Sequence, residues 1–172
     1  DERTIRLLPA GTPFKQSHIY EFTYRATAPL VAGLGLAATR DFVSFLRHEA
    51  SDDFGNANPL AGDVQYTFSW TRSQPGRYIN DFQTLGFNED ENGRRVIDGM
   101  ENWIGGSGGV AINYRFAQTA RTERNRSNHF YPESIFPFAY PVLKDPVSGK
   151  TGGRSARCLA SGTCPKVFEV NS

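Results

Sequence analysis

The segment from Val64 to Gly86 constrains the fold of this chain more than any other part of the sequence. Apolar residues alternate with polar ones from Val64 to Trp70, which is the period of a strand with one buried face. A helix is predicted directly afterwards, because Pro75 suits a first helical turn, an apolar stripe follows, and Gly86 suits the C-terminal cap. Ser73 falls in the turn between them. The segment therefore predicts a strand, a sharp turn and a helix.

Further strand and helix patterns flank this unit. Strand propensity is high over residues 19–24, 95–100 and 165–170. After Pro29, a helix is predicted from Leu30 through Arg47. Its apolar stripe consists of Leu34, Ala38, Phe42, Phe45 and Leu46, and Arg40, Asp41 and Arg47 lie away from that stripe. Residues 51–62 are rich in Asp, Asn, Gly and Pro and are predicted to form a loop. Strands that alternate with helices predict an α/β fold with a mainly parallel sheet flanked by helices.

We expect residues 1–172 to belong to one domain, with a long irregular excursion over residues 105–164. The run of glycines from Gly105 to Gly109 is predicted to be a flexible turn, and residues 113–140 carry few periodic signals. Excursions of this length in compact domains are usually functional or lid-like. The aromatic residues of this excursion could line an apolar substrate pocket, or they could anchor a loop to the domain. They are Phe130, Tyr131, Phe136, Phe138 and Tyr140.

Composition excludes several classes of protein. The 172 residues include 19 basic and 18 acidic side chains, so no strong positive field favours nucleic acid as a partner. The longest apolar run, Pro29 to Ala38, is too short to span a bilayer. The pattern Gly33-x-Gly35 lacks the third glycine of a dinucleotide loop, and no cluster has the spacing of a metal site, so we expect no cofactor and no metal. The chain begins at Asp1 without Met or a signal sequence, which indicates a processed chain or a piece of a longer one.

Cys158 and Cys164 are the two cysteines of the chain, and a Ser-Gly pair between them allows a tight loop. A disulfide between them would indicate an exported protein, either secreted or periplasmic. The alternative is a pair of unrelated buried thiols in a reducing compartment. We expect the disulfide.

Ser73 is the strongest candidate for chemistry. A serine hydroxyl becomes a nucleophile when a base takes its proton and hydrogen-bond donors stabilise the oxyanion. A tight turn from strand to helix lifts the side chain out of the sheet and directs the N–H of Gln74 at the developing charge, whereas Pro75 has no N–H to give. The local pattern alone also fits a simple helix N-cap serine.

A wider set of residues carries a resemblance to a known family. The stretch Thr71-Arg72-Ser73-Gln74-Pro75-Gly76-Arg77, followed by Gly86-Phe87-Asn88, resembles α/β-hydrolase-domain proteins with a Gly-x-Ser-Gln-x-Gly-Arg elbow. Similar stretches extend over most of the chain; they are 29–46, 87–99, 113–118, 136–140 and 164–168. The resemblance implies a serine esterase that cleaves a small carboxylic ester through an acyl-enzyme, with Ser73 as nucleophile. Thr71 replaces the first glycine of the elbow, and Pro75 replaces a small residue.

The same resemblance implies a catalytic acid after a strand near residues 167–170, and a histidine after the next strand. Glu169 lies within the predicted strand and is not assigned as the acid. Of the three histidines, His18 and His48 precede the nucleophile, and His129 is the remaining candidate for the base. The resemblance thus implies an incomplete sheet, completed by other segments of the parent chain or by a partner subunit. The alternative function is a non-catalytic structural or binding fragment that keeps the scaffold without a full triad.

Overall fold

The structure is a computed structural model that describes residues 4–18, 20, 25, 27–28, 33–106, 108–110 and 136–171. The chain divides into two compact units, Asp1–Leu30 and Val31–Ser172. The first unit contains a tight turn in which Thr12 N donates to Pro9 O. The strand predicted over residues 19–24 lies, apart from Tyr20, outside the described residues. The elements that follow all belong to the second unit.

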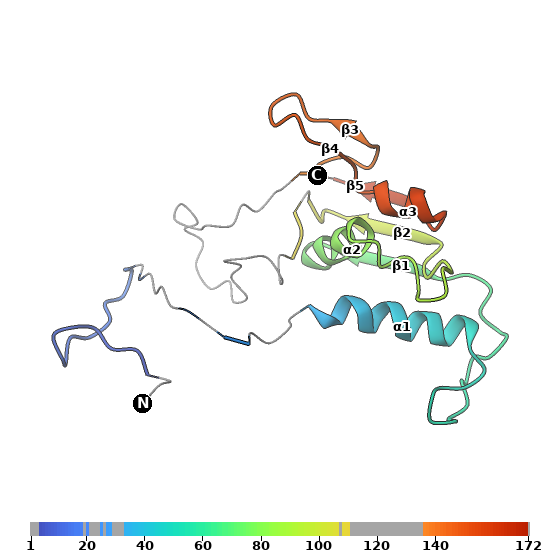
Figure 1. Ribbon diagram of the computed structural model, residues 1–172, viewed down its shortest axis with the longest axis horizontal. Helices are drawn as coiled ribbons and strands as arrows, with labels where there is room; N and C mark the ends of the chain where they lie inside the picture. Colours follow the sequence, from blue (N-terminus) through green and yellow to red (C-terminus); the bar gives the residue numbers. More distant parts are fainter. Residues whose placement is uncertain are drawn as a thin grey trace. The chain divides into compact units, whose positions relative to one another are not determined.

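A parallel sheet is the centre of the second unit (Figure 1). Its three strands are β1 (Phe68–Arg72), β2 (Gly99–Trp103) and β5 (Lys166–Val170), in the order β1-β2-β5. The pairing aligns Arg72 with Trp103 and Trp103 with Val170, so the three strands end level with one another. The predicted parallel α/β architecture is confirmed.

Two of these strands begin later than their patterns predict. Residues 64–67 precede β1, because Thr67 bonds to the connection before β2: its N–H donates to Asp98 Oδ2 at 3.0 Å. Val96 and Ile97 precede β2 and are held instead by Asn88, whose Oδ1 accepts from Ile97 N at 2.9 Å. At the amino end of the sheet, these side-chain bonds supplement backbone bonds such as that from Asp98 N to Thr67 O at 2.9 Å.

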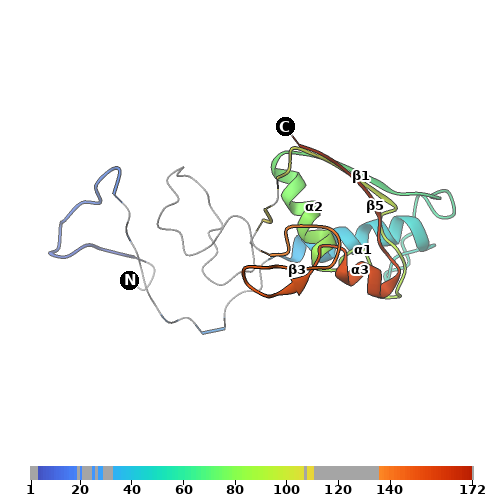
Figure 2. The same ribbon diagram turned by 90° about the horizontal axis from the view of Figure 1, so that it is seen from above.

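Helix α2 (Gln74–Thr84) connects β1 to β2 and packs on the sheet. Pro75 lies in its first turn, and Gly86 follows its C-cap with a φ of 88°, as the sequence predicts. The main core cluster joins α1 (Leu34–His48), α2 and the sheet; its buried members are Leu36, Ile79, Phe82, Val96, Ile97 and Met100. In Figure 2, α1, α2 and α3 (Ala156–Ser161) lie on the same side of the sheet.

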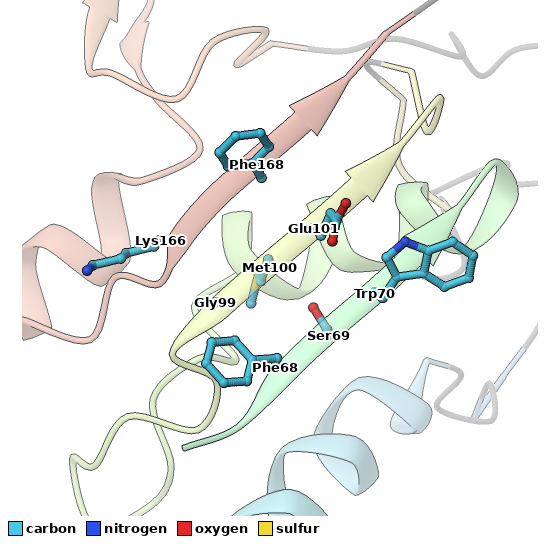
Figure 3. Close-up of a pocket in the computed structure, with 8 residues that line it drawn as sticks. All are labelled: Phe68, Ser69, Trp70, Gly99, Met100, Glu101, Lys166 and Phe168. Carbon is cyan, nitrogen blue, oxygen red and sulfur yellow. The ribbon is translucent and has the colours of Figure 1, made fainter. Parts of the chain in front are cut away.

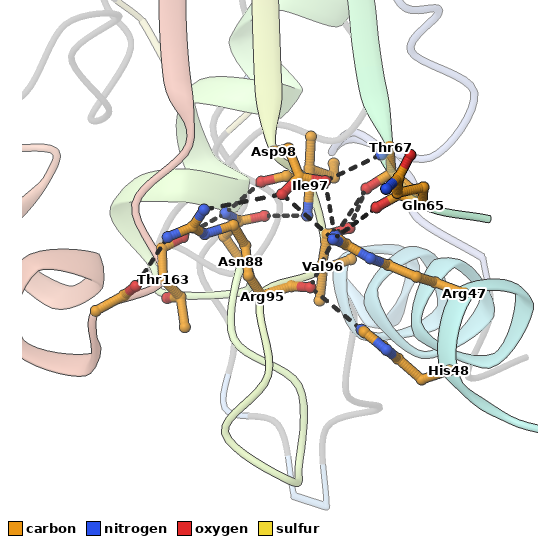
Figure 4. A network of polar contacts seen from close by, with 11 residues as sticks. Arg47, His48, Gln65, Thr67, Asn88, Arg95, Val96, Ile97, Asp98 and Thr163 are labelled. Atoms are coloured by element: carbon orange, nitrogen blue, oxygen red, sulfur yellow. Dashed lines mark hydrogen bonds and ion pairs between the residues drawn. The ribbon is translucent and has the colours of Figure 1, made fainter.

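The predicted apolar stripe of α1 is wrong in part. Leu34 and Phe42 are 64% and 61% exposed, whereas Leu36 and Val43 contact the core. Arg47, expected away from the buried side, is half-buried, and its Nη1 lies 2.8 Å from Asp98 Oδ2 (Figure 4). The helix is therefore turned so that its last turn bonds to the amino end of the sheet.

The predicted excursion over 105–164 is less irregular than expected where the structure describes it. A small antiparallel pair forms between β3 (Leu143–Lys144) and β4 (Thr151–Gly152), and α3 follows. A disulfide joins Cys158, which is buried, to Cys164, with 4.6 Å between their Cα atoms. The expected disulfide is confirmed. Residues 107 and 111–135 lie outside the described part of the chain.

The sheet face opposite the helices carries large aromatic side chains. Phe68, Trp70 and Phe168 are all exposed, and they border a shallow groove of about 510 Å³ over Gly99 (Figure 3). Side chains alternate along each strand, so Met100 enters the core while these aromatics face away from it.

Candidate active site

The turn between β1 and α2 holds Ser73 in an unusual backbone conformation. Its φ is 62° and its ψ is −125°, a region that non-glycine residues rarely adopt. Such a conformation costs on the order of 1–3 kcal/mol and persists only where the surroundings enforce it. Here the chain must turn from the end of a strand directly into a helix, and Ser73 is the single residue between them. The residue is exposed at the carboxyl end of the sheet.

Backbone hydrogen bonds fix this residue on both sides. Ser73 N donates to Trp103 O, the last residue of β2, at 2.8 Å, and Gly76 N donates to Ser73 O at 2.9 Å. Ser73 stands at the N-cap position of α2, but its hydroxyl makes no capping hydrogen bond. The simple N-cap interpretation therefore does not describe what the hydroxyl does.

The N-terminus of α2 lies next to Ser73. The first N–H groups of a helix have no partner within the helix, and together with the helix dipole they favour a negative charge. Gln74 is the first residue of α2, so its N–H belongs to this group. Pro75 has no N–H, but its ring fits the first turn without breaking the helix.

Thr71, at the position where the family elbow has glycine, is accommodated by β2. Its register partner is Asn102, and its Oγ1 donates to Glu101 O at 3.3 Å. The threonine side chain thus lies against the neighbouring strand. The turn at Ser73 forms with threonine in place.

Helix α2 and the segment after β2 approach each other very closely. A Cβ added to Gly76 would lie 2.6 Å from Gly105 Cα, and one added to Gly105 would lie 2.9 Å from Gly76 Cα. The described part of the glycine-rich run is also fastened to α2: Asn80 Nδ2 donates to Gly106 O at 3.0 Å, and Val110 N donates to Asp81 Oδ2 at 2.7 Å. Buried side chains of α2 thus bond to the backbone of the run that the sequence predicts to be a flexible turn.

Sequence reasoning missed the contribution of this segment to the site. Trp103 O and the buried Asn102 come from β2, which pairs with β1 at an offset of 31 residues, as between Thr71 and Asn102. The signal that could have found it is the glycine run itself, since several glycines together can also mark a close approach of two backbone segments.

Of the three histidines, the structure places His48 alone relative to Ser73. His48 is the last residue of α1, and its Nε2 lies 3.4 Å from Arg95 O, before the start of β2. Ser73 follows the carboxyl end of β1, so His48 and Ser73 lie at opposite ends of the parallel strands. His18 belongs to the other compact unit, and His129 lies outside the described residues.

Glu169 lies within β5, as predicted, in the register row of Thr71 and Asn102. It interacts with Tyr140: burial, together with the nearby Glu169 carboxylate, raises the pKa of Tyr140 to about 12, although Arg154 acts in the opposite direction. The Arg154 guanidinium also lies 5.4 Å from the centre of the Tyr140 ring. Glu169 therefore belongs to a cluster that joins β5 to residues 136–155.

Within the described ranges, no group of three or more Asp, Glu, His or Cys side chains could hold a metal ion. None of the helices described there has the length and apolar character needed to cross a bilayer.

Comparison with known proteins identifies the family. The family described as alpha/beta hydrolase domain matches residues 14–172, which is most of the chain. The same comparison found no curated protein and no solved structure that matches the chain. The match covers the whole of the parallel sheet, the turn at Ser73 and the helices that flank them. The chain is therefore a member of the alpha/beta hydrolase domain family.

Proposed function

We propose that this chain supplies the nucleophile of a serine hydrolase that acts on a small carboxylic ester. The observation that carries the proposal is the strained backbone of Ser73, at φ 62° and ψ −125°, between β1 and the N-terminus of α2. Ser73 is an exposed residue, and its hydroxyl makes no capping hydrogen bond of the kind that a serine at this position usually makes. The family match supports hydrolysis as the type of reaction.

The proposed reaction proceeds through an acyl-enzyme. Ser73 Oγ attacks the ester carbonyl carbon while a base takes the hydroxyl proton, and the N–H of Gln74 donates to the resulting oxyanion. The C–O bond to the alcohol then breaks, and the alcohol leaves with a proton. Water attacks the acyl-enzyme in the second half and releases the acid and Ser73. The base is either His129 or a histidine from outside this sequence.

A non-catalytic scaffold is the second candidate function. Thr71 at the glycine position of the elbow favours it. The position of His48 near the amino ends of the strands, away from Ser73, favours it as well. The Cys158–Cys164 disulfide supports an exported protein under either function, and we propose a secreted or periplasmic location.

The test is labelling of the full-length protein with a fluorophosphonate, followed by peptide mapping. We expect a single adduct on Ser73, and we expect Ser73→Ala to abolish labelling and lower kcat on an activated ester by at least about 10³-fold. Ser69→Ala is the matched control, because Ser69 lies on the same strand with its Oγ buried. Adduct on another serine, or undiminished labelling of Ser73→Ala, would refute the assignment. A folded protein that takes no label would favour the scaffold.

A further inference from the structure

Asn102 is a buried amide directly beneath the turn that carries Ser73. Its residue is 1% exposed, and it pairs in register with Thr71, two residues before Ser73. Met100, two residues earlier on β2, belongs to the core, so Asn102 also faces α2. A polar side chain at such a depth is expensive to bury unless its hydrogen bonds are satisfied.

The Asn102 amide connects three elements around the turn. Its Nδ2 lies 3.4 Å from Gly76 O and 3.3 Å from Asn80 Oδ1, both on α2. Its Oδ1 lies 3.4 Å from Thr71 Oγ1 on β1. The amide therefore links the strand that precedes Ser73 to the helix that follows it.

Asn80 extends this link to the segment after β2. Asn80 is also buried, at 4% exposed, and its Nδ2 donates to Gly106 O at 3.0 Å and to Gly108 O at 3.3 Å. The two amides thus form a continuous polar chain from β1, through β2 and α2, to the glycine-rich segment.

The space around Asn102 leaves no freedom for the helix to shift towards it. A Cβ on either Gly76 or Gly105 would collide with the Asn102 amide. The first turn of α2 therefore rests on Asn102 and on the backbone of Gly105. Two backbone hydrogen bonds hold Ser73 itself: its N–H donates to Trp103 O, and its carbonyl oxygen accepts from Gly76 N. The second of these bonds depends on where α2 begins.

We infer that Asn102, with Asn80 behind it, is a positioning residue for Ser73: it holds the start of α2 against β2 and so maintains the strained turn. The catalytic use of the turn rests on the proposed function, but the positioning of residue 73 by Asn102 does not depend on catalysis. Without the amide, the strain at Ser73 would relax through a small movement of the first turn of α2.

Asn88 provides a matched control. It is the same residue type, is fully buried, and its Nδ2 donates to Ile97 O at 2.9 Å and to Thr163 O at 2.6 Å (Figure 4). It lies before the amino end of β2, whereas Asn102 lies near the carboxyl end. Loss of either amide should destabilise the protein, but loss of Asn102 alone should alter the environment of residue 73.

The first experiment uses a thiol at position 73 in the full-length, oxidised protein. Cys158 and Cys164 are joined, so Ser73→Cys adds a free thiol whose alkylation by iodoacetamide can be followed against pH. A helix N-terminus lowers the pKa of a neighbouring thiol. We expect Asn102→Ala to raise that thiol pKa and slow alkylation at neutral pH at least about threefold, and Asn88→Ala to leave both unchanged.

The thiol pKa of each variant is compared only under conditions in which circular dichroism shows that the variant is folded. If Asn102→Ala does not fold, Asn80→Ala tests the same chain of amides from its other end, with the same expected direction. The same thiol pKa in the Asn102→Ala, Asn80→Ala and Asn88→Ala backgrounds would overturn the inference, and so would equal shifts in all three.

The second experiment separates this inference from the proposed function. With serine at position 73, we expect Asn102→Ala to lower the rate constant of fluorophosphonate labelling by about 10- to 100-fold, the range that a small misplacement of a reacting group produces. Asn88→Ala should label at the wild-type rate. If the wild-type protein takes no label, the proposed function fails, while the thiol pKa still decides whether Asn102 positions residue 73.

Discussion

Replacement of Asp90 by asparagine tests how the loop after α2 is fixed. The Asp90 residue is 7% exposed, and its carboxylate accepts hydrogen bonds from Ser44 Oγ at 2.5 Å and from Arg94 N and Nε at 2.7 Å each. Burial alone would raise the pKa of Asp90, but the hydrogen bonds from Ser44 and Arg94 outweigh it and lower the pKa from 3.8 to about 2.

The size of the effect follows from that shift. A folded-state pKa below the unfolded value stabilises the protein at pH values above the unfolded pKa, and the contribution is lost as the pH falls through the folded pKa. At about 1.4 kcal/mol per pKa unit, Asp90 contributes roughly 2.5 kcal/mol at pH 7 and about 1.3 kcal/mol at pH 3. Asp90→Asn keeps the shape and removes the charge, so the variant should be less stable by similar amounts.

Urea denaturation of wild type and variant at pH 7, 5 and 3 measures the difference in unfolding free energy. Asp53→Asn serves as the control, because Asp53 is exposed, and it should change stability by less than about 0.5 kcal/mol at each pH. A difference between wild type and Asp90→Asn that stays constant from pH 7 to pH 3 would refute the reasoning. Equal stability at pH 7 would refute it as well.

Three further predictions concern packing and the disulfide. Gly76→Ala places a Cβ 2.6 Å from Gly105 Cα, so we expect a loss of at least about 1–3 kcal/mol by urea denaturation, and slower labelling of the folded fraction. Phe82→Ala empties a fully buried site and should cost about 3–5 kcal/mol in the same assay; a loss under 1 kcal/mol would contradict the packing described. Reduction of Cys158–Cys164, which closes a loop of sequence separation 6, should cost about 2 kcal/mol, and intact mass after alkylation without reductant should detect no free thiol.

The strand, turn and helix around Ser73 were predictable because their signals are local. Pro75 and Gly86 mark the two ends of α2 through backbone preferences that act within a few residues. The last strand was likewise predictable from its apolar β-branched and aromatic residues, and β5 occupies Lys166–Val170.

The orientation of α1 could not be predicted from its own sequence. Leu34 and Phe42 are as apolar as Leu36, and the side that faces the sheet is decided by distant partners. Arg47 pairs with Asp98, 51 residues away. A helical period identifies an apolar stripe. The hydrogen bonds and ion pair of an arginine with distant acceptors can still turn the helix so that part of that stripe faces solvent.

The same reason explains why Asn102 was missed in the candidate site. Its partners Gly76 and Asn80 lie 26 and 22 residues away, and an asparagine within a strand carries no local signal of burial. The strands β3 and β4 have two residues each, too few for any alternation to be recognised. The sharp turn at Ser73, by contrast, was predicted from its immediate neighbours, whereas the proposal of Ser73 as nucleophile depended on the wider family resemblance.

The open face of the sheet gives this protein an optical property. Trp70 and Trp103 are its two tryptophans, they are 64% and 40% exposed, and the strand register puts both side chains on the face away from the helices. All of the indole emission therefore originates at that face. An indole ring emits at shorter wavelength when water leaves it, so a blue shift would report contact with this face without any attached dye. The emission maximum of the untouched protein should lie close to that of a hydrated indole.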